Sequence, residues 1–187
     1  MLYTINKNTI QISLGDITKQ FEDVIVNAAN GSLLGGSGVD GAIHKAAGPE
    51  LLNACKRIRK NELNGEYLQT GEAVITKGYN LPAKYVIHTV GPIWDKNLKD
   101  IQERQLGNCY RNALDLATQH GLKSIVFPSI STGAYRYPIE QASSIALETV
   151  LEFLKKNDFG KVIFVLFSEM DYKIYERKIK SLVSNNN

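Results

Sequence analysis

A glycine-rich segment near the start of the chain carries the residues best suited to chemistry. Residues 26–41 read VNAANGSLLGGSGVDG, and the glycines at 35, 36, 38 and 41 lie at the start of a predicted helix. Bare backbone N–H groups at the positive end of a helix dipole bind phosphate. Asp40 would place a carboxylate near that phosphate, although an Asp in this position can equally cap the helix. The residues alone leave both roles open.

The same segment matches the G-x-G-x-x-G pattern of dinucleotide-binding folds at residues 36–41. In those folds the first glycine follows its strand at once, and an acidic residue ends the next strand about 20 residues later. Here Gly36 lies well beyond the apolar run that ends at Val26, and Glu62 follows two predicted helices with no strand between them. We therefore interpret the match as coincidental, which disfavours a nicotinamide-dependent oxidoreductase.

Two other loops offer groups for the same kind of ligand. Residues 128–138, PSISTGAYRYP, supply small hydroxyl and glycine donors to an anion, before a helix that Pro138 can start. Two anion-binding loops on different strands favour a diphosphate over a single phosphate. In the segment 15–18, Asp16 can accept a hydrogen bond from an exocyclic amine such as that of adenine, or cap a short helix. That segment alone favours the cap.

Alternating strands and helices must position these loops. Short apolar runs predict strands at 24–26, 73–76, 85–90, 124–130 and 162–167, after an alternating strand pair at 2–6 and 9–14 with a turn at Lys7-Asn8. Helical periodicity fills 39–47, 49–60, 103–120, 139–156 and 172–183, and residues 184–187 are expected to fray. The alternation predicts an α/β sandwich with a mixed or mostly parallel sheet. In such folds ligands bind beyond the carboxyl ends of the strands.

The composition is that of an ordinary globular protein, with 43% hydrophobic and 22% charged residues and a formal net charge of +3. A basic cluster near the end is interrupted by other residues, which indicates the solvated face of an amphipathic helix. Its members are Lys173, Arg177, Lys178 and Lys180. No window is apolar enough to span a membrane and no signal core opens the chain, so we expect a cytoplasmic protein without membrane attachment.

The cysteines and histidines show no metal-binding pattern. Cys55 and Cys109 lie far apart, and His44, His88 and His120 are isolated from one another along the chain. We expect two reduced, buried thiols and no metal. His88 lies inside an apolar strand and is expected to be structural.

The chain resembles the macrodomain family in five motifs taken together: GDIT at 15–18, VNAAN at 26–30, GGSGVDGAIHKAAG at 35–48, HTVGP at 88–92 and STGAYRYP at 131–138. The similarity is to the MacroD-type branch, which hydrolyses ADP-ribosyl groups and O-acetyl-ADP-ribose. It implies a single macrodomain over residues 1–187, a three-layer α/β/α sandwich with a mixed, mostly parallel central sheet. It also implies no cofactor and no metal, since the ligands of the zinc-dependent branch are absent.

The resemblance implies individual roles in binding ADP-ribose. Asp16 would hold the adenine amine with help from the backbone of Ile17, and Phe167 would stack on the adenine. Asn30 would bind the distal ribose, with Asp40 beside it and essential for turnover. The other implied contacts are a supporting role near the ligand for Asn27, phosphate-binding loops at Gly36, Ser37, Gly38, Val39 and at Ser131, Thr132, Gly133, Ala134, Tyr135, and a distal-ribose wall at Tyr135.

Elementary chemistry suits Asn30 and Asp40 as the catalytic pair. A carboxylate leaving group departs without protonation, so one positioned carboxylate can orient or deprotonate the attacking water. Whether Asp40 is a true base or a water-positioning group stays open. Ser37 and Arg136 replace glycines common in the family, and neither change removes a residue that the chemistry needs.

We therefore expect a hydrolase that removes mono-ADP-ribose from acidic side chains of modified proteins, deacetylates O-acetyl-ADP-ribose, or does both. One alternative is an ADP-ribose reader without turnover, against which the presence of both Asn30 and Asp40 argues. Another is a protein that binds RNA or poly(ADP-ribose), for which the sequence offers only scattered basic residues. The physiological substrate and the oligomeric state stay open.

Overall fold

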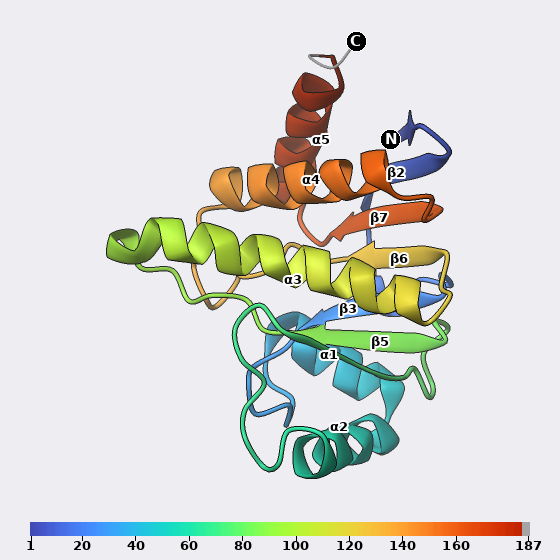
Figure 1. Cartoon of the computed structure of the whole chain (residues 1–187), viewed down its shortest axis with the longest axis vertical. Coiled ribbons are helices and arrows are strands. Elements are labelled where there is room, and N and C mark those ends of the chain that lie inside the picture. Colours follow the sequence, from blue (N-terminus) through green and yellow to red (C-terminus); the bar gives the residue numbers. More distant parts are fainter. Residues whose placement is uncertain (185–187) are drawn as a thin grey trace.

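Seven strands form one mixed sheet in the order β1-β2-β7-β6-β3-β5-β4. The structure is a computed structural model and describes residues 1–184 (Figure 1). The five inner strands pair in parallel, and each edge strand pairs antiparallel with its neighbour. The strands are β1 (Leu2–Ile5), β2 (Asn8–Leu14), β3 (Val24–Ala28), β4 (Ala73–Lys77), β5 (Tyr85–Thr89), β6 (Ser124–Phe127) and β7 (Lys161–Leu166).

Five helices and two short 3-10 turns cover the sheet. They are α1 (Gly38–Ala47), α2 (Pro49–Asn61), α3 (Lys99–Gln119), α4 (Ile139–Lys156), α5 (Glu169–Ser184), η1 (Ile17–Lys19) and η2 (Lys96–Leu98). Helices α3 and α4 lie in front of the sheet in Figure 1, and α1 lies behind it. This arrangement confirms the predicted three-layer α/β/α sandwich with a mixed, mostly parallel sheet.

The central strands are buried on both faces, which explains their continuous apolar runs. In β3, Val24 and Val26 pack with α3, α4 and α5, whereas Ile25 packs with residues of α1 and α2 on the opposite face. All three side chains are fully buried. The alternation follows from the two-residue period of a strand, and each such side chain contributes about 1.5–3 kcal/mol of burial free energy.

The element boundaries differ from the prediction at several ends. Strand β6 ends at Phe127 instead of residue 130, because Pro128 lacks the N–H that the ladder needs. Helix α3 begins at Lys99 and α5 at Glu169, each a few residues before the predicted start. Of the expected frayed end 184–187, Ser184 belongs to α5, and residues 185–187 lie outside the described residues.

The predicted turn at Lys7-Asn8 is one residue too late. The turn lies at Asn6 and Lys7, where Asn6 adopts a φ of 54°, and Asn8 is the first residue of β2. Asn8 is buried, and its side chain hydrogen-bonds to backbone groups at the end of α4 and just before β7. Its Oδ1 accepts hydrogen bonds from the N–H groups of Phe159 and Gly160, and its Nδ2 donates to two carbonyls, those of Leu154 and Asn157.

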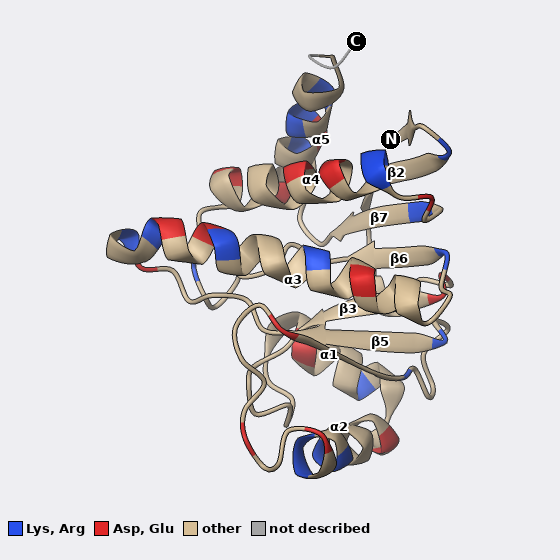
Figure 2. Cartoon of the chain, in the orientation of Figure 1, with Lys and Arg blue, Asp and Glu red and all other residues tan. Residues whose placement is uncertain are grey.

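The outer helix faces carry mixed charge. Lys and Arg are interspersed with Asp and Glu along α3, whereas in α4 the acidic residues come first and the basic residues lie in the last turn (Figure 2). The basic cluster of α5 lies beside acidic partners: Lys173 pairs with Glu169, Lys180 with Glu176, and both Arg177 and Lys178 with Glu140. This pairing agrees with a solvated helix face. No helix within residues 1–184 combines the length and the apolarity that crossing a membrane requires.

Candidate active site

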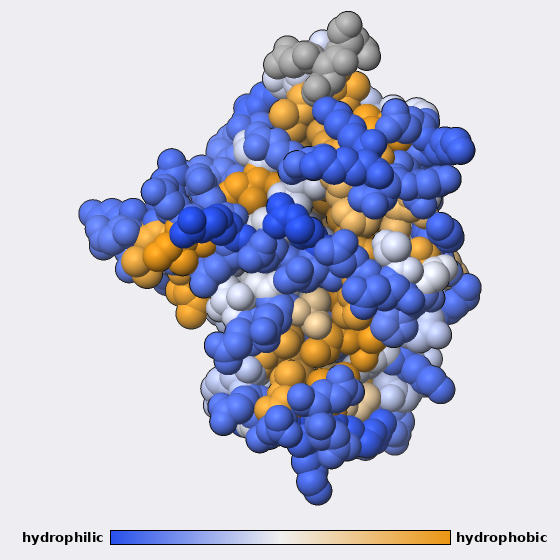
Figure 3. Space-filling model, in the orientation of Figure 1, coloured by the Kyte–Doolittle hydropathy of each residue, from blue (hydrophilic) through white to orange (hydrophobic). Residues whose placement is uncertain are grey.

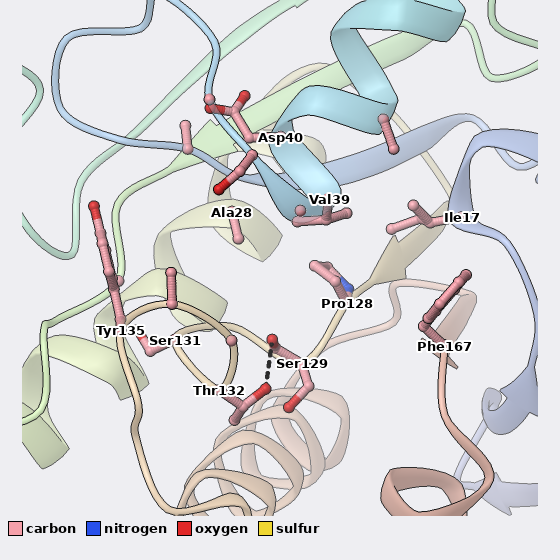
Figure 4. A pocket seen from close by; sticks show the side chains of 18 of the residues that line it. Ile17, Ala28, Val39, Asp40, Pro128, Ser129, Ser131, Thr132, Tyr135 and Phe167 are labelled. Atoms are coloured by element: carbon pink, nitrogen blue, oxygen red, sulfur yellow. Dashed lines mark hydrogen bonds between the residues drawn. The ribbon is translucent and has the colours of Figure 1, made fainter.

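One pocket of about 580 Å³ opens at the carboxyl ends of the inner strands (Figure 4). Segments that directly follow β2, β3, β6 and β7 supply its walls, together with the start of α1. The lining includes almost every residue predicted to bind ADP-ribose or act on it: Asp16, Ile17, Asn30, Gly36, Ser37, Gly38, Val39, Asp40, Ser131, Thr132, Gly133, Ala134, Tyr135 and Phe167. Residues far apart in the sequence therefore meet because parallel strands end at one edge.

Ile17 and Phe167 lie at one end of the pocket, opposite Asp40 and Tyr135 (Figure 4). Phe167 directly follows β7 and is 91% exposed, an unusual position for an aromatic ring that packs against nothing. Asp16 does cap η1: its Oδ1 accepts from the N–H and the hydroxyl of Thr18, at 2.8 and 2.7 Å. The side-chain hydrogen bond from Thr18 holds the pKa of Asp16 below its usual value, so a carboxylate acceptor lies at this end.

The start of α1 offers unbonded backbone donors to an anion. Ser37 occupies the N-cap position, and its side chain makes no capping hydrogen bond. Gly38 has a φ of +60°, a conformation that L side chains rarely adopt, so this turn favours glycine. The first N–H groups of α1 lie at the positive end of its helix dipole, and this end borders the pocket. The arrangement suits phosphate binding.

The loop after β6 forms the facing wall and is tightly fixed. Ser131 has a φ of 68°, and its Oγ is buried without a hydrogen-bond partner. The N–H of Tyr137 donates to the carbonyl of Ser131, and the N–H of Trp94 donates to the carbonyl of Tyr135. Arg136, with a φ of 57°, is exposed and lies outside the pocket wall, so its side chain does not line the predicted phosphate site.

Gly91 is a pocket residue that sequence reasoning missed. A Cβ at this position would lie 2.0 Å from the Oγ of Ser131 and 2.6 Å from the Cγ2 of Ile130. Only glycine therefore lets the segment after β5 pack against the Ser131 loop. The HTVGP motif was the available signal, but a close approach between two loops is invisible in a sequence. Pro128 and Ser129, within the predicted anion-binding loop, also line the pocket, as do Gly15, Ala28, Ala29 and Asp171, which were given no individual role.

Asp40 lies on the pocket wall, yet only 4% of its surface is exposed. Its Oδ1 accepts a hydrogen bond from Asn27 Nδ2 at 2.8 Å and lies 3.4 Å from His44 Nε2. Burial raises the pKa of Asp40 above the usual carboxyl value, while the Asn27 bond and the His44 ring oppose that increase. The result is a desolvated carboxylate in a fixed orientation.

Asn27 is placed differently from the prediction that it binds the ligand. The side chain of Asn27 is fully buried and does not line the pocket. It donates instead to Asp40, which does line the pocket. Besides its bond to Asp40, Nδ2 lies 3.1 Å from His88 Nδ1, and His88 Nε2 lies 3.0 Å from the hydroxyl of Thr76. Asn27 thus holds Asp40 from behind.

His88 is a neutral ring in the hydrogen-bonded series that runs from Asp40 through Asn27 to His88. Burial, with a smaller effect of the nearby His44, lowers the pKa of His88 to about 3. A neutral imidazole with its proton on Nε2 keeps a lone pair on Nδ1 that accepts from the Asn27 amide. Both amide hydrogens of Asn27 are then used, one on Asp40 and one on His88, whereas Asn27 Oδ1 has no partner among the described residues.

Asn30 lies on the pocket wall beside Asp40. Its Nδ2 donates to the carbonyl of Gly35 at 2.6 Å, and the hydroxyl of Ser32 donates to its Oδ1. Gly36 passes between the two candidate catalytic residues, since a Cβ there would lie 3.0 Å from Asp40 Oδ2 and 3.2 Å from Asn30 Nδ2. The glycine-rich segment, whose backbone groups suit phosphate, therefore also brings Asn30 and Asp40 together.

Two of the histidines that are isolated along the chain come close together in the fold. Within residues 1–184, His44 of α1, Cys55 of α2 and His88 of β5 come together, and their potential metal-ligand atoms all lie within 4.8 Å of one another. Three separate elements supply these side chains, so no local spacing announces them. Both cysteines are free and buried, as expected.

Comparison with known proteins places this geometry in context. The Macro domain family model matches residues 26–146. A solved structure, the Oceanobacillus iheyensis macrodomain with ADP, is 61% identical, covers 99% of this chain and 97% of that chain, and superposes with a TM-score of 0.97. The O-acetyl-ADP-ribose deacetylase of Citrobacter koseri is 52% identical over 91% of this chain and 95% of its own length. The ADP-ribose glycohydrolase MACROD2 of Xenopus laevis is 54% identical over 88% of this chain, which spans 38% of that longer protein.

Proposed function

The chain belongs to the Macro domain family, and we propose that it is a hydrolase of ADP-ribose adducts. Its substrates would be proteins that carry mono-ADP-ribose on acidic side chains, O-acetyl-ADP-ribose, or both. The observation that carries the proposal is the buried carboxylate of Asp40 at one end of a pocket whose two facing loops suit a diphosphate. Relatives named as an ADP-ribose glycohydrolase and an O-acetyl-ADP-ribose deacetylase support it.

The pocket suggests one direction for the ligand. The adenine would lie between Asp16, Ile17 and the exposed ring of Phe167. The diphosphate would lie between the start of α1 and the Ser131 loop, which places the distal ribose beside Asp40, Asn30 and Tyr135. Both ends are thus assigned by chemistry: an amine acceptor with an aromatic ring at one, and a desolvated carboxylate at the other.

Asp40 would act by positioning water. For a protein ester, water attacks the anomeric carbon, the bond from that carbon to the carboxylate oxygen breaks, and the acidic side chain leaves with the electron pair. The proton lost by the water passes to solvent or to Asp40. No partnered acid is required, because a carboxylate is a stable leaving group. For an acetyl ester, water attacks the acyl carbon, acetate forms, and the released ribose oxygen takes up a proton.

A product assay tests the proposal. Wild type, Asn30→Ala and Asp40→Ala are each given a glutamate-modified protein and O-acetyl-ADP-ribose, and ADP-ribose and acetate are quantified. Calorimetry with ADP-ribose runs in parallel. The proposal predicts turnover of at least one substrate by wild type and its loss in Asp40→Ala with binding retained. Binding of ADP-ribose by wild type without release of either product would make the protein a reader instead of an enzyme.

A further inference from the structure

The cluster of His44, Cys55 and His88 lies outside the ADP-ribose pocket. None of the three residues lines the pocket wall. Cys55 and His88 are fully buried, and the side chain of His44 is 13% exposed. The cluster lies directly behind the catalytic carboxylate, since His44 Nε2 is 3.4 Å from Asp40 Oδ1 and His88 reaches Asp40 through Asn27.

Two imidazole nitrogens and one sulfur form a ligand set that Zn²⁺ and other thiophilic divalent cations prefer. Tetrahedral zinc with bonds of about 2.0–2.3 Å requires ligand atoms separated by about 3.3–3.8 Å. Cys55 Sγ and His88 Nε2 are already 3.8 Å apart. All potential ligand atoms lie within 4.8 Å, so the remaining adjustment falls on His44, the most exposed member.

The cluster lies next to a second hollow in the surface, through its partly exposed member His44. His44 lines a second, shallow hollow on the surface, formed with residues of the glycine-rich segment and of the α1–α2 junction. The residues of that hollow include Leu34, Gly35, Gly41, Gly48 and Pro49. An ion that displaces the His44 ring from this side enters without passing through the ADP-ribose pocket. Gly36 borders both this hollow and the larger pocket.

We propose that His44, Cys55 and His88 bind a thiophilic divalent cation, with Zn²⁺ as the probe, and that the bound cation inhibits hydrolysis. Binding converts the Cys55 thiol to a thiolate and releases one proton to solvent. Ligation through His88 Nε2 moves the ring proton to Nδ1, where it meets Asn27 Nδ2, another donor, at 3.1 Å. The Asn27 amide then rotates so that its unpartnered Oδ1 accepts a hydrogen bond from the Nδ1–H of His88. The turn withdraws Nδ2 from Asp40, and His44 leaves Asp40 as well.

Cobalt absorption tests the site independently of any activity. Co²⁺ is titrated into the metal-free full chain, and the thiolate-to-cobalt charge-transfer band and the tetrahedral d–d bands are recorded, followed by displacement with Zn²⁺. Wild type gives both bands. Cys55→Ser loses the thiolate band, and its Zn²⁺ affinity falls by at least about tenfold. Cys109→Ser is the matched control, because that buried thiol lies outside the cluster and donates to the carbonyls of Val90 and Gln105, and it keeps both bands.

Folding of each variant is checked by ADP-ribose calorimetry, and His44→Ala, altered at the partly exposed ligand, serves if Cys55→Ser does not fold. It weakens Zn²⁺ binding in the same way. The absence of a thiolate band in wild type overturns the site, as does its retention in Cys55→Ser or its loss in Cys109→Ser.

Inhibition by the bound cation rests on the proposed function and is measured separately. Zn²⁺ slows ADP-ribose release by wild type, a chelator restores it, and Cys55→Ser releases at a rate that Zn²⁺ does not change. Release by wild type that stays constant at saturating Zn²⁺ contradicts inhibition while leaving the site intact. A wild type with no hydrolysis at all refutes the proposed function, and the cobalt spectrum still decides whether the cation binds.

Discussion

At the scale of single residues, Asp40 experiences two opposing influences. Burial disfavours its charged form, whereas the amide of Asn27 and the ring of His44 favour it. A carboxylate held in this way is oriented before the substrate arrives, so catalysis need not include the energetic cost of ordering it. The orientation of Asp40 depends on Asn27, whose side chain does not line the pocket.

Replacing Asn27 with Ala tests this dependence. Without the amide, Asp40 loses the hydrogen bond from Asn27 Nδ2, and we expect the rate of ADP-ribose release to fall by about 10²-fold. The Kd for ADP-ribose should change little, because Asn27 lies outside the pocket wall. Single-turnover kinetics and calorimetry separate the two quantities. A variant that binds weakly but turns over normally when saturated would return Asn27 to the ligand-contacting role predicted from its family.

Asn27 also shows where prediction from sequence stops at this scale. The residue types left the roles of Asp16 and Asp40 open, and the family resemblance predicted Asp16, Asn30 and Asp40 around one ligand; all three line one pocket in the structure. The relay through His88 depends on strand register, in which Asn27 of β3 pairs with His88 of β5. Register between distant strands has no local signal, so His88 could only be predicted as a buried structural histidine.

At the scale of elements, the pocket requires two loops from different strands to pack closely. The loop after β5 contains Gly91, and the loop after β6 contains Ser131 in a left-handed conformation. Chain connectivity predicts that both loops lie at one edge of the sheet, but not that they touch. The predicted strand at 124–130 extended three residues too far, since β6 ends before Pro128 and residues 128–130 begin this loop.

Gly91→Ala should displace the Ser131 loop. The added Cβ would lie 2.0 Å from Ser131 Oγ, so the loop must shift, and we expect ADP-ribose affinity to fall by at least about tenfold because the phosphate donors move with it. Gly107→Ala in α3 is the control: its added Cβ meets ordinary contacts at 3.4 and 3.8 Å. Calorimetry measures both variants. Equal affinities in the two would show that the close approach does not shape the site.

Asp23 joins three elements at the opposite edge of the sheet. Its carboxylate accepts hydrogen bonds from Lys84 Nζ at 2.8 Å and from the N–H groups of Lys123 and Ser124, at the start of β6. The bond from Lys84 is the largest cause that lowers the pKa of Asp23 in the folded state. A lowered folded pKa stabilises the fold above the unfolded value of about 3.9, and this contribution is lost as the pH falls through the folded pKa.

Asp23→Asn should therefore be less stable than wild type near neutral pH. The difference in free energy of unfolding should shrink once the pH drops below about 4, where the wild-type carboxyl begins to take up its proton. Urea denaturation at a series of pH values measures both chains. A difference that stays constant down to pH 2, or one that grows on acidification, contradicts the assigned contribution.

At the scale of the whole molecule, the chain's two ends meet in one sheet. Strand β2 pairs with β7, so residues near the start lie beside residues near the end. Alternating apolar patterns were sufficient to predict an α/β sandwich, whereas the strand order is set by contacts between distant segments. Hydrophilic residues cover most of the face in Figure 3, with apolar surface at the projecting end of α3, where the exposed Leu98 and Ile101 lie.

Asn8 links the start of β2 to the segment between α4 and β7 by hydrogen bonds. Its side chain bonds four backbone groups in residues 154–160, more than 140 positions away in sequence. Asn8→Ala leaves two fully buried backbone groups, the carbonyl of Leu154 and the N–H of Phe159, without partners at about 1–3 kcal/mol each, so we expect stability to fall by about 2–6 kcal/mol. Asn6→Gly, which removes one exposed bond to Lys155 and tolerates the positive φ of this turn, should change stability far less. Urea denaturation compares them, and similar losses in both variants would contradict the role of Asn8.

The most direct test of the whole account is the single-turnover release of ADP-ribose from a glutamate-modified protein by wild type and by Asp40→Asn. The substitution keeps the size of the side chain and removes its charge. With Asp40 positioning the water, release falls by at least about 10²-fold while the Kd for ADP-ribose stays within about threefold. Release by Asp40→Asn at the wild-type rate, with ADP-ribose bound equally well, would contradict the catalytic role of this carboxylate.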